Sequence, residues 1–195
     1  MGRRIGRERT LTLLRHGEAE GSAGDAHLTE LGQAEADAAG QYLARLGAPR
    51  AIWCSDMARA VETAKRVRGA FSPTPSLHRT VELRECLPGR PILERDQDMP
   101  FEDLVFQAGL QQADRAFERF FIPARIQDKH EVLVTHGNLI RALVCRALGV
   151  DPFAWTHFEI GTASLTRIRI DSDGHMHLLC FNERAFLDPL SDVPF

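Results

Sequence analysis

The chain has 195 residues, of which 44% are hydrophobic, and this is enough to bury one core; we expect a single domain over residues 1–195. Its net charge of −3 excludes a general attraction to nucleic acid. No apolar run is long enough to span a bilayer, and the segment "MGRRIGRERT" lacks the apolar stretch of a signal peptide. Four separated cysteines without a C-x-x-C pair fit a reducing compartment. We therefore expect a cytoplasmic protein with no nucleic-acid and no membrane partner.

The first half of the chain alternates strand and helix patterns. Leu11 to Arg15 is predicted as a strand buried on both faces, because every residue before Arg15 in it is apolar or β-branched. Thr29 is a candidate cap for the helix that follows. The elements predicted here are strands over 11–15, 51–55 and 77–83 and helices over 29–46 and 57–71. The inward face predicted for the first helix consists of Leu31, Ala34, Ala38, Tyr42 and Leu46.

The second half begins with a loop over 86–100 that contains three prolines and one glycine. The elements predicted after it are helices over 101–122 and 138–148, a strand over 131–135, and a hairpin that turns at "DSDG". The inward face of the helix over 101–122 is predicted from Leu104, Val105, Ala108, Ala116, Phe117 and Phe120.

This order of elements predicts an α/β protein: a three-layer sandwich in which helices flank a mostly parallel central sheet. Its core covers about residues 10–182, and residues 183–195 are expected to form a C-terminal tail.

Charged and polar side chains follow the predicted strands at their carboxyl ends. Arg15 and His16 end the first strand, Arg59 follows the second, Glu85 follows the third, and His136 precedes the last long helix. Because ligands of such sheets bind beyond the carboxyl ends of the strands, these side chains are expected to meet at one rim.

Each of these residue types has a role if the ligand is a phosphoryl group. Guanidinium groups bind phosphate oxygens in a bidentate manner, and the backbone amides of a helix that starts at Gly137 would add further donors. A neutral imidazole is a nucleophile toward phosphorus, and a carboxylic acid can protonate the departing oxygen. The pattern therefore predicts a phosphoryl-transfer site.

Five segments in this order, "LLRHGEAE", "LTELGQAEA", "SDMARAVETA", "ELRE" and "VTHGNLIRALV", resemble the histidine phosphatase superfamily, which has the phosphoglycerate mutase-like fold. The resemblance runs from about residue 10 to residue 169. It implies no metal and no other cofactor. The roles that it implies are His16 as the phosphorylated nucleophile, Glu85 as the proton donor, and Arg15, Arg59 and His136 as phosphate-binding groups, with Gly137 and Asn138 beside the substrate.

Within this superfamily the order of features is most similar to the serine/threonine protein phosphatases of the phosphoglycerate mutase family. The Trp and Asn that mutases usually carry after R-H-G-E are absent from "RHGEAEGSAGDAHLTE", which favours hydrolysis over transfer between hydroxyls. The resemblance thus implies a metal-independent phosphatase that acts on a phosphorylated small molecule or a phosphoprotein. It also makes a homodimer an expectation.

Several alternatives stay open at this point. Glu82 competes with Glu85 for the acid role, and Cys86 is either an oxidisable thiol or a bystander. His16, His136 and Glu85 could instead bind a metal, as in a metallohydrolase. The fold could also serve as a non-enzymatic phosphate-binding scaffold, or as a sugar or nucleotide phosphatase or a mutase. The loop over 86–100 would decide between a protein and a metabolite as substrate.

Overall fold

The computed structural model describes residues 7–21, 25–89 and 100–190, and its strands form one six-stranded sheet in the order β3-β2-β4-β1-β5-β6. The strands are β1 (Arg9–Arg15), β2 (Ala51–Ser55), β3 (Ser76–Thr80), β4 (Lys129–Thr135), β5 (Leu165–Ile170) and β6 (Met176–Glu183). The helices are α1 (Glu30–Leu46), α2 (Ala58–Gly69), α3 (Pro100–Phe120) and α4 (Gly137–Leu148). Shorter 3-10 segments are η1 (Val81–Leu83), η3 (Pro152–His157) and η4 (Ala185–Leu190).

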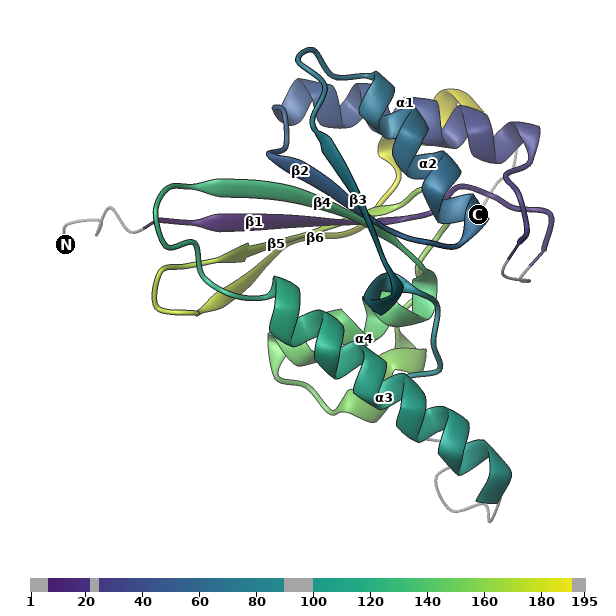
Figure 1. Ribbon diagram of the computed structural model, residues 1–195, viewed down its shortest axis with the longest axis vertical. Coiled ribbons are helices and arrows are strands. Elements are labelled where there is room, and N and C mark those ends of the chain that lie inside the picture. Colours follow the sequence, from purple (N-terminus) through teal and green to yellow (C-terminus); the bar gives the residue numbers. More distant parts are fainter. Residues whose placement is uncertain (1–6, 22–24, 90–99, 191–195) are drawn as a thin grey trace.

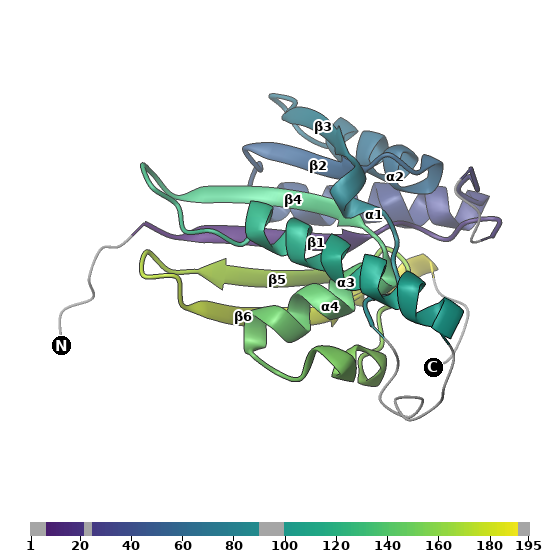
Figure 2. The same cartoon turned by 60° about the horizontal axis from the view of Figure 1, so that its bottom comes forward.

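The sheet lies between two helical layers, with α1 and α2 on one face and α3 and α4 on the other (Figure 1). Strands β3, β2, β4 and β1 run parallel, whereas β5 is antiparallel to β1 and β6 is antiparallel to β5. Figure 2 shows the strands side by side from β3 to β6. The predicted three-layer α/β sandwich with a mostly parallel sheet is confirmed.

Strand β1 lies inside the sheet and is covered on both faces. Leu11 and Leu13 pack into the core beneath α3 and α4, while Leu14 packs into the core beneath α1 and α2. All three side chains are fully buried. A strand that is covered on both faces favours apolar residues at every position, which explains the continuous apolar run in the sequence.

The buried residues of α1 are mostly the ones that follow the predicted residues, so the inward face is shifted by about one position along the chain. Leu31 and Leu46 are 42% and 41% exposed. The buried positions are Gly32, Glu35, Ala36, Ala39, Gly40 and Leu43. A Cβ on Gly40 would lie 3.0 Å from the Cα of Val67. The helix therefore turns its smallest residues toward α2, because they allow the two backbones to approach closely.

The first half of α3 also differs from the prediction. Leu104 and Val105 are 66% and 44% exposed, because this half of the helix extends beyond the sheet (Figure 1). The second half supplies the buried contacts, through Ala113, Ala116 and Phe120. Similarly, the strand expected over 77–83 ends at Thr80, and the chain continues as η1.

The expected C-terminal tail is largely packed against the body of the protein. Strand β6 extends to Glu183, and η4 follows it. The ring of Phe186 stacks on Tyr42 of α1 with centroids 4.8 Å apart, and Leu187 is buried. Residues 183–190 therefore belong to the folded domain, while residues 191–195 lie outside the described part of the chain.

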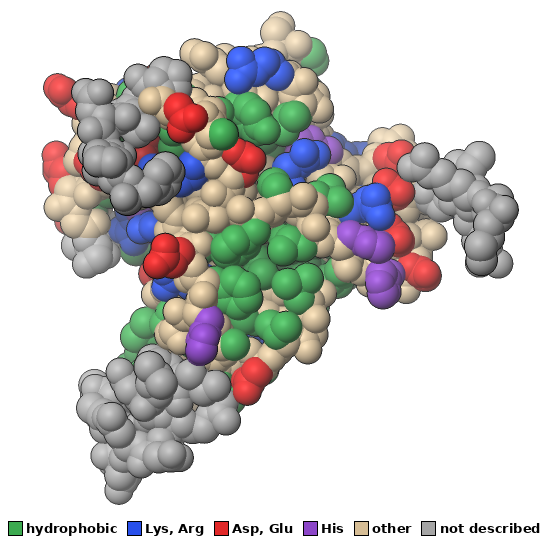
Figure 3. All heavy atoms as spheres, turned by 180° about the vertical axis from the view of Figure 1, so that it is seen from behind, with side chains coloured by type: hydrophobic (Ala, Val, Ile, Leu, Met, Phe, Trp, Pro, Cys, Tyr) green, Lys and Arg blue, Asp and Glu red, His purple; other side chains and the backbone are tan. Residues whose placement is uncertain are grey.

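Apolar side chains gather in the middle of the face opposite to that of Figure 1 (Figure 3). Among the larger exposed apolar residues of the structure are Leu148 and Val150, each 40% exposed, and Leu179 in the edge strand β6, 45% exposed. Scattered exposed apolar residues are normal, whereas a gathered group is a candidate contact surface.

Candidate active site

The backbone of His16 is held between two neighbouring segments at the end of β1. Its amide donates to the carbonyl of Thr135 at 3.0 Å, and its own carbonyl accepts from the amide of Ala163 at 3.1 Å. The residue is only 7% exposed. The position of the imidazole is therefore fixed by β4 on one side and by the segment before β5 on the other.

The imidazole of His16 is held in one tautomer. Nδ1 lies 2.7 Å from the carbonyl oxygen of Gly17, so Nδ1 carries the proton and donates it. Nε2 then keeps its lone pair and accepts from Nε of Arg59 at 3.1 Å. Burial, together with the charges of Arg59 and Arg15, lowers the pKa of His16 to about 4. The ring is thus neutral at pH 7, with an available nitrogen.

His136 lies beside this ring at the N-terminus of α4. It is fully buried, and its centroid is 5.0 Å from that of His16. Burial is the main cause that lowers its pKa to about 2, followed by His16, Arg59 and Arg15. Neither ring nitrogen has a hydrogen-bond partner among the described residues. Because buried polar atoms are nearly always paired, these nitrogens indicate room for a ligand.

Two guanidinium groups, of Arg15 and Arg59, lie beside the imidazoles of His16 and His136. We call these four side chains the phosphate cup. Arg59 is 3% exposed, and Arg15 donates through Nη1 to the carbonyl of Ile160. Nε of Arg15 has no hydrogen-bond partner within the described ranges. A Cβ on Gly137 would lie 3.6 Å from this nitrogen, so the guanidinium rests against the start of α4. Burial lowers the pKa of both arginines, and the carboxylate of Glu85 counteracts this.

Glu85 is half-buried and lies beyond η1, near the same start of α4. Its Oε1 accepts from the amides of Leu139 at 3.4 Å and Cys86 at 3.1 Å. Burial raises the pKa of Glu85, although these amides and Arg15 act in the opposite direction. Thr135 holds η1 in place by donating from its hydroxyl to the carbonyl of Leu83 at 2.8 Å. A carboxyl group with a raised pKa suits a proton donor.

The residues that competed for these roles lie elsewhere or are otherwise engaged. Glu82 accepts hydrogen bonds from Arg119 of α3 and from the Thr80 hydroxyl. Burial, and next the charge of Glu85, raises the pKa of Cys86 to about 12. A reactive thiolate at Cys86 is therefore disfavoured. The predicted substrate-binding residue Asn138 lies in the first turn of α4, where its Oδ1 accepts from Arg141 at 3.2 Å.

Sequence reasoning missed Thr63, which links the predicted site residue Arg59 to Gly17, the residue after His16. Its hydroxyl accepts from the amide of Gly17 at 3.1 Å and donates to the carbonyl of Arg59 at 2.8 Å. Thr63 is fully buried. The available signal was a hydroxyl on the inward face of α2, between alanines and valines.

Glu35 was missed as well. This α1 carboxylate is 3% exposed and accepts from the Glu18 amide at 2.8 Å and the Thr162 hydroxyl at 2.7 Å. A Cβ on Gly17 would lie 2.3 Å from the carbonyl oxygen of Gly32. The segment after His16 thus packs directly on the start of α1, and Glu35 ties it to the segment before β5.

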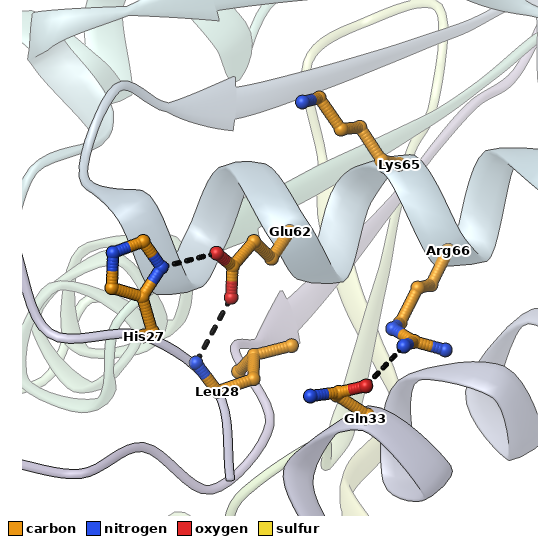
Figure 4. Close-up of a pocket in the computed structure, with 6 residues that line it drawn as sticks. All are labelled: His27, Leu28, Gln33, Glu62, Lys65 and Arg66. Carbon is orange, nitrogen blue, oxygen red and sulfur yellow. Dashed lines mark hydrogen bonds and ion pairs between the residues drawn. The ribbon is translucent and has the colours of Figure 1, made fainter. Parts of the chain in front are cut away.

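A separate cavity of about 540 Å³ lies at the start of α1 and along α2 (Figure 4). Glu62 accepts there from His27 at 2.5 Å and from the amide of Leu28 at 2.9 Å, while Arg66 donates to Gln33. His27, whose side chain is 65% exposed, pairs with Glu62, and Arg66 also pairs with Asp37 of α1. This cavity holds none of the predicted site residues.

Comparison with known proteins identifies the family. Residues 11–102 and 106–183 match the model of the histidine phosphatase superfamily (branch 1), so the chain belongs to this family. The predicted resemblance is confirmed.

The chain is similar to two curated relatives, both serine/threonine-protein phosphatases Pgam5, mitochondrial. The one from Drosophila persimilis is 32% identical over 188 residues, covering 92% of this chain and 64% of the relative. The one from Xenopus laevis is 32% identical over 167 residues, covering 84% and 60%. The chain thus spans less than two thirds of the length of these relatives.

Among solved structures, the fold is similar to a crystal structure of phosphoglycerate mutase from Plasmodium falciparum. The two chains are 26% identical, with a TM-score of 0.65, and the match covers 97% of this chain and 96% of the other. This agrees with the phosphoglycerate mutase-like fold expected from the motifs.

The expected cytoplasmic location is contradicted by the curated relatives, because both are named as mitochondrial proteins. The expectation rested on the absence of an apolar segment and on the four separated cysteines. Within the described ranges, none of the helices combines the length and the apolar character needed to cross a membrane. That observation does not bear on the compartment.

Proposed function

We propose that this chain, as a single catalytic domain, is a phosphoric monoester hydrolase that forms a phosphohistidine at His16. The observation that carries the proposal is the neutral His16 ring, which turns Nε2 toward Arg59 beside the buried and unpaired nitrogens of His136. Membership in the histidine phosphatase superfamily supports it.

In the first step, the substrate phosphate binds to Arg15, Arg59 and His136. Nε2 of His16 attacks phosphorus, so that an N–P bond forms while the bond to the substrate oxygen breaks. Glu85 gives its proton to the departing oxygen, which leaves as an alcohol. The guanidinium groups stabilise the charge on the phosphoryl oxygens during the transfer.

In the second step, the ionised Glu85 takes a proton from water, and the resulting hydroxide attacks the phosphorus of phosphohistidine. The N–P bond breaks, inorganic phosphate leaves, and both His16 and Glu85 return to their starting protonation states. Amides at the start of α4, from Gly137 and Asn138, would face the same phosphate.

The metal-free chemistry is part of this proposal. Residues 7–21, 25–89 and 100–190 contain no group of three or more His, Cys, Asp or Glu side chains that could hold a metal ion. Arg15 and Arg59 would supply the positive charge instead. Activity that survives a chelator and is inhibited by vanadate would support the histidine mechanism, and loss of activity with the chelator alone would favour a metallohydrolase.

The substrate class that we propose is an alkyl phosphomonoester such as phosphoserine or phosphothreonine, in a protein or as a small molecule. The relatives named as serine/threonine-protein phosphatases support the protein substrate, and the mutase structure keeps a small metabolite as the alternative. Turnover of p-nitrophenyl phosphate by the purified chain is the first test. Failure to hydrolyse it would favour a phosphate-binding scaffold. If the chain does hydrolyse it, a panel of phosphopeptides, sugar phosphates and nucleotides would rank the substrates.

The expected homodimer also stays a proposal. Its support is the gathered apolar side chains of Figure 3 and the exposed Leu179 of the edge strand β6. Light scattering of the purified chain would give the mass of a dimer, and a monomer mass at all tested concentrations would contradict it.

A further inference from the structure

A cavity of about 650 Å³ adjoins the phosphate cup and plays no part in the mechanism above. Its lining includes Ile160 and Gly161, and the carbonyl of Ile160 is the group that accepts from Arg15. Arg15 therefore contacts the wall of the cavity through Ile160, and its charge also helps to lower the pKa of His16 and of His136. A group bound in the cavity would lie next to a phosphate bound in the cup.

Two guanidinium groups line this cavity. Arg141 comes from α4, one turn after Asn138, and Arg184 follows β6. Both are close enough to Arg15 for their charges to contribute to its lowered pKa, after burial. The buried Nε atoms of both side chains lack a hydrogen-bond partner in the part of the chain that is described. The charges of Glu85 and Glu35 act on Arg15 in the opposite direction, so it is the unpaired donor atoms of Arg141 and Arg184 that favour an anionic ligand.

The two arginines differ in how they are held. Arg184 donates to Glu35 at 3.3 Å, whereas Arg141 has no ion pair within residues 7–21, 25–89 and 100–190 and donates only to the amide oxygen of Asn138 among them. A Cβ on Gly161 would lie 2.5 Å from Cδ of Arg184. Glycine at position 161 thus leaves the space in which the Arg184 side chain lies.

The backbone has a left-handed conformation at the same cavity. Asn182 has a φ of 51°, in a region that glycine and asparagine adopt more readily than other residues. Its Oδ1 accepts from the amide of Gly161 at 2.8 Å, which fixes the side chain along the cavity wall.

Two carboxylates, Glu159 and Asp188, also line the cavity, and both residues are exposed. They reduce the positive potential, so the cavity suits a singly charged carboxylate better than a second, doubly charged phosphate.

We propose that Arg141 and Arg184 bind a carboxylate that the substrate carries close to its phosphate group. This rests on the proposed function, and it narrows the substrate to phosphate esters with a neighbouring carboxylate. The carboxylate can come from a small molecule such as a phosphorylated hydroxy amino acid, or from an acidic side chain next to a phosphorylated residue in a peptide.

The test compares substrates that differ only in this carboxylate. We expect kcat/KM for O-phosphoserine to exceed that for its carboxamide about tenfold, since a charge-assisted hydrogen bond is lost. In Arg141→Gln and Arg184→Gln this ratio should fall to within about twofold of one, and Arg141→Lys should keep part of it. Arg50→Gln, at the opposite end of the strands, should leave the ratio unchanged. A wild-type ratio near one, or variants that leave it unchanged, would overturn the proposal.

A second pair of substrates separates the two sources of the carboxylate. Phosphoserine peptides with Asp or Asn beside the phosphorylated residue would show the same ratio only if an acidic side chain reaches the cavity. Calorimetric binding of O-phosphoserine and its carboxamide to His16→Ala gives a readout without turnover. If the wild type fails to hydrolyse p-nitrophenyl phosphate, the proposed function fails, while this binding comparison still decides whether the carboxylate site exists.

Discussion

Nε of Arg59 donates a hydrogen bond to Nε2 of His16 at 3.1 Å, so a permanent cation faces the nitrogen that would attack phosphorus. The arrangement keeps the imidazole unprotonated, because a proton on Nε2 would meet the guanidinium charge. The same guanidinium would bind the phosphate as it approaches. In the proposed mechanism, this one contact would both prepare the nucleophile and position the substrate.

Replacing His16 with Ala should remove nearly all turnover of p-nitrophenyl phosphate, by a factor of about 10³ or more, because no covalent intermediate can form. The measurement is steady-state kinetics together with a thermal melt. The exposed His175 gives the control, and His175→Ala should match the wild type. Substantial turnover by folded His16→Ala would contradict the assignment.

Glu85→Gln should slow alkyl phosphates about 100-fold in kcat/KM and aryl phosphates only a few-fold. An alkoxide needs a proton to leave, whereas nitrophenolate leaves without one. Because kcat/KM reports on steps up to the release of the alcohol, it excludes the later role of Glu85 as a base. Glu82→Gln is the matched control, since Glu82 is engaged with Arg119. Equal slowing of both substrate types would argue against Glu85 as the proton donor.

The buried imidazoles should make the protein less stable at acidic pH. The pKa of His16 is about 4 and that of His136 about 2 in the folded chain, against about 6.5 when unfolded. The unfolded state therefore binds more protons below pH 6.5, so stability that is present above this value is lost as the pH falls toward the folded pKa. At pH 5 the loss is up to about 2 kcal/mol for each ring.

Urea unfolding at several pH values checks this linkage. His136→Asn should lose less of its free energy of unfolding between pH 7 and pH 5 than the wild type does, by up to about 2 kcal/mol. Identical pH profiles for the two proteins would show that His136 is not held in its neutral form.

Thr63→Val should reduce both stability and activity. The valine keeps the shape but removes the acceptor for the amide of Gly17, and a buried unpaired amide costs about 1–3 kcal/mol. Thr63→Ser keeps the hydroxyl and should recover most of the activity. Denaturant melts and kcat/KM for p-nitrophenyl phosphate would be measured on both variants. Equal behaviour of the valine and serine variants would mean that the hydroxyl does not position the segment after His16.

Much of the fold and site follows from local sequence. Strand β1 is predicted from the apolar residues of its own segment. The start of α1 is predicted from Thr29, whose hydroxyl accepts from the amide of Gly32 three residues later. The meeting of His16 and His136 also follows, because parallel strands place their carboxyl ends at one edge of the sheet.

Other features were decided only when distant segments packed together. The face of α1 that is buried depends on how closely Gly40 lets α2 approach, and the sequence of α1 alone does not contain that distance. The roles of Glu35 and Thr63 depend on hydrogen bonds to segments elsewhere in the chain. Periodicity describes one element at a time, whereas these contacts need the relative positions of two. The sequence by itself therefore determined the helices and strands and the residues at the strand ends. The tertiary structure decided which helix faces are buried and which additional residues, Glu35 and Thr63, hold the segments around the site.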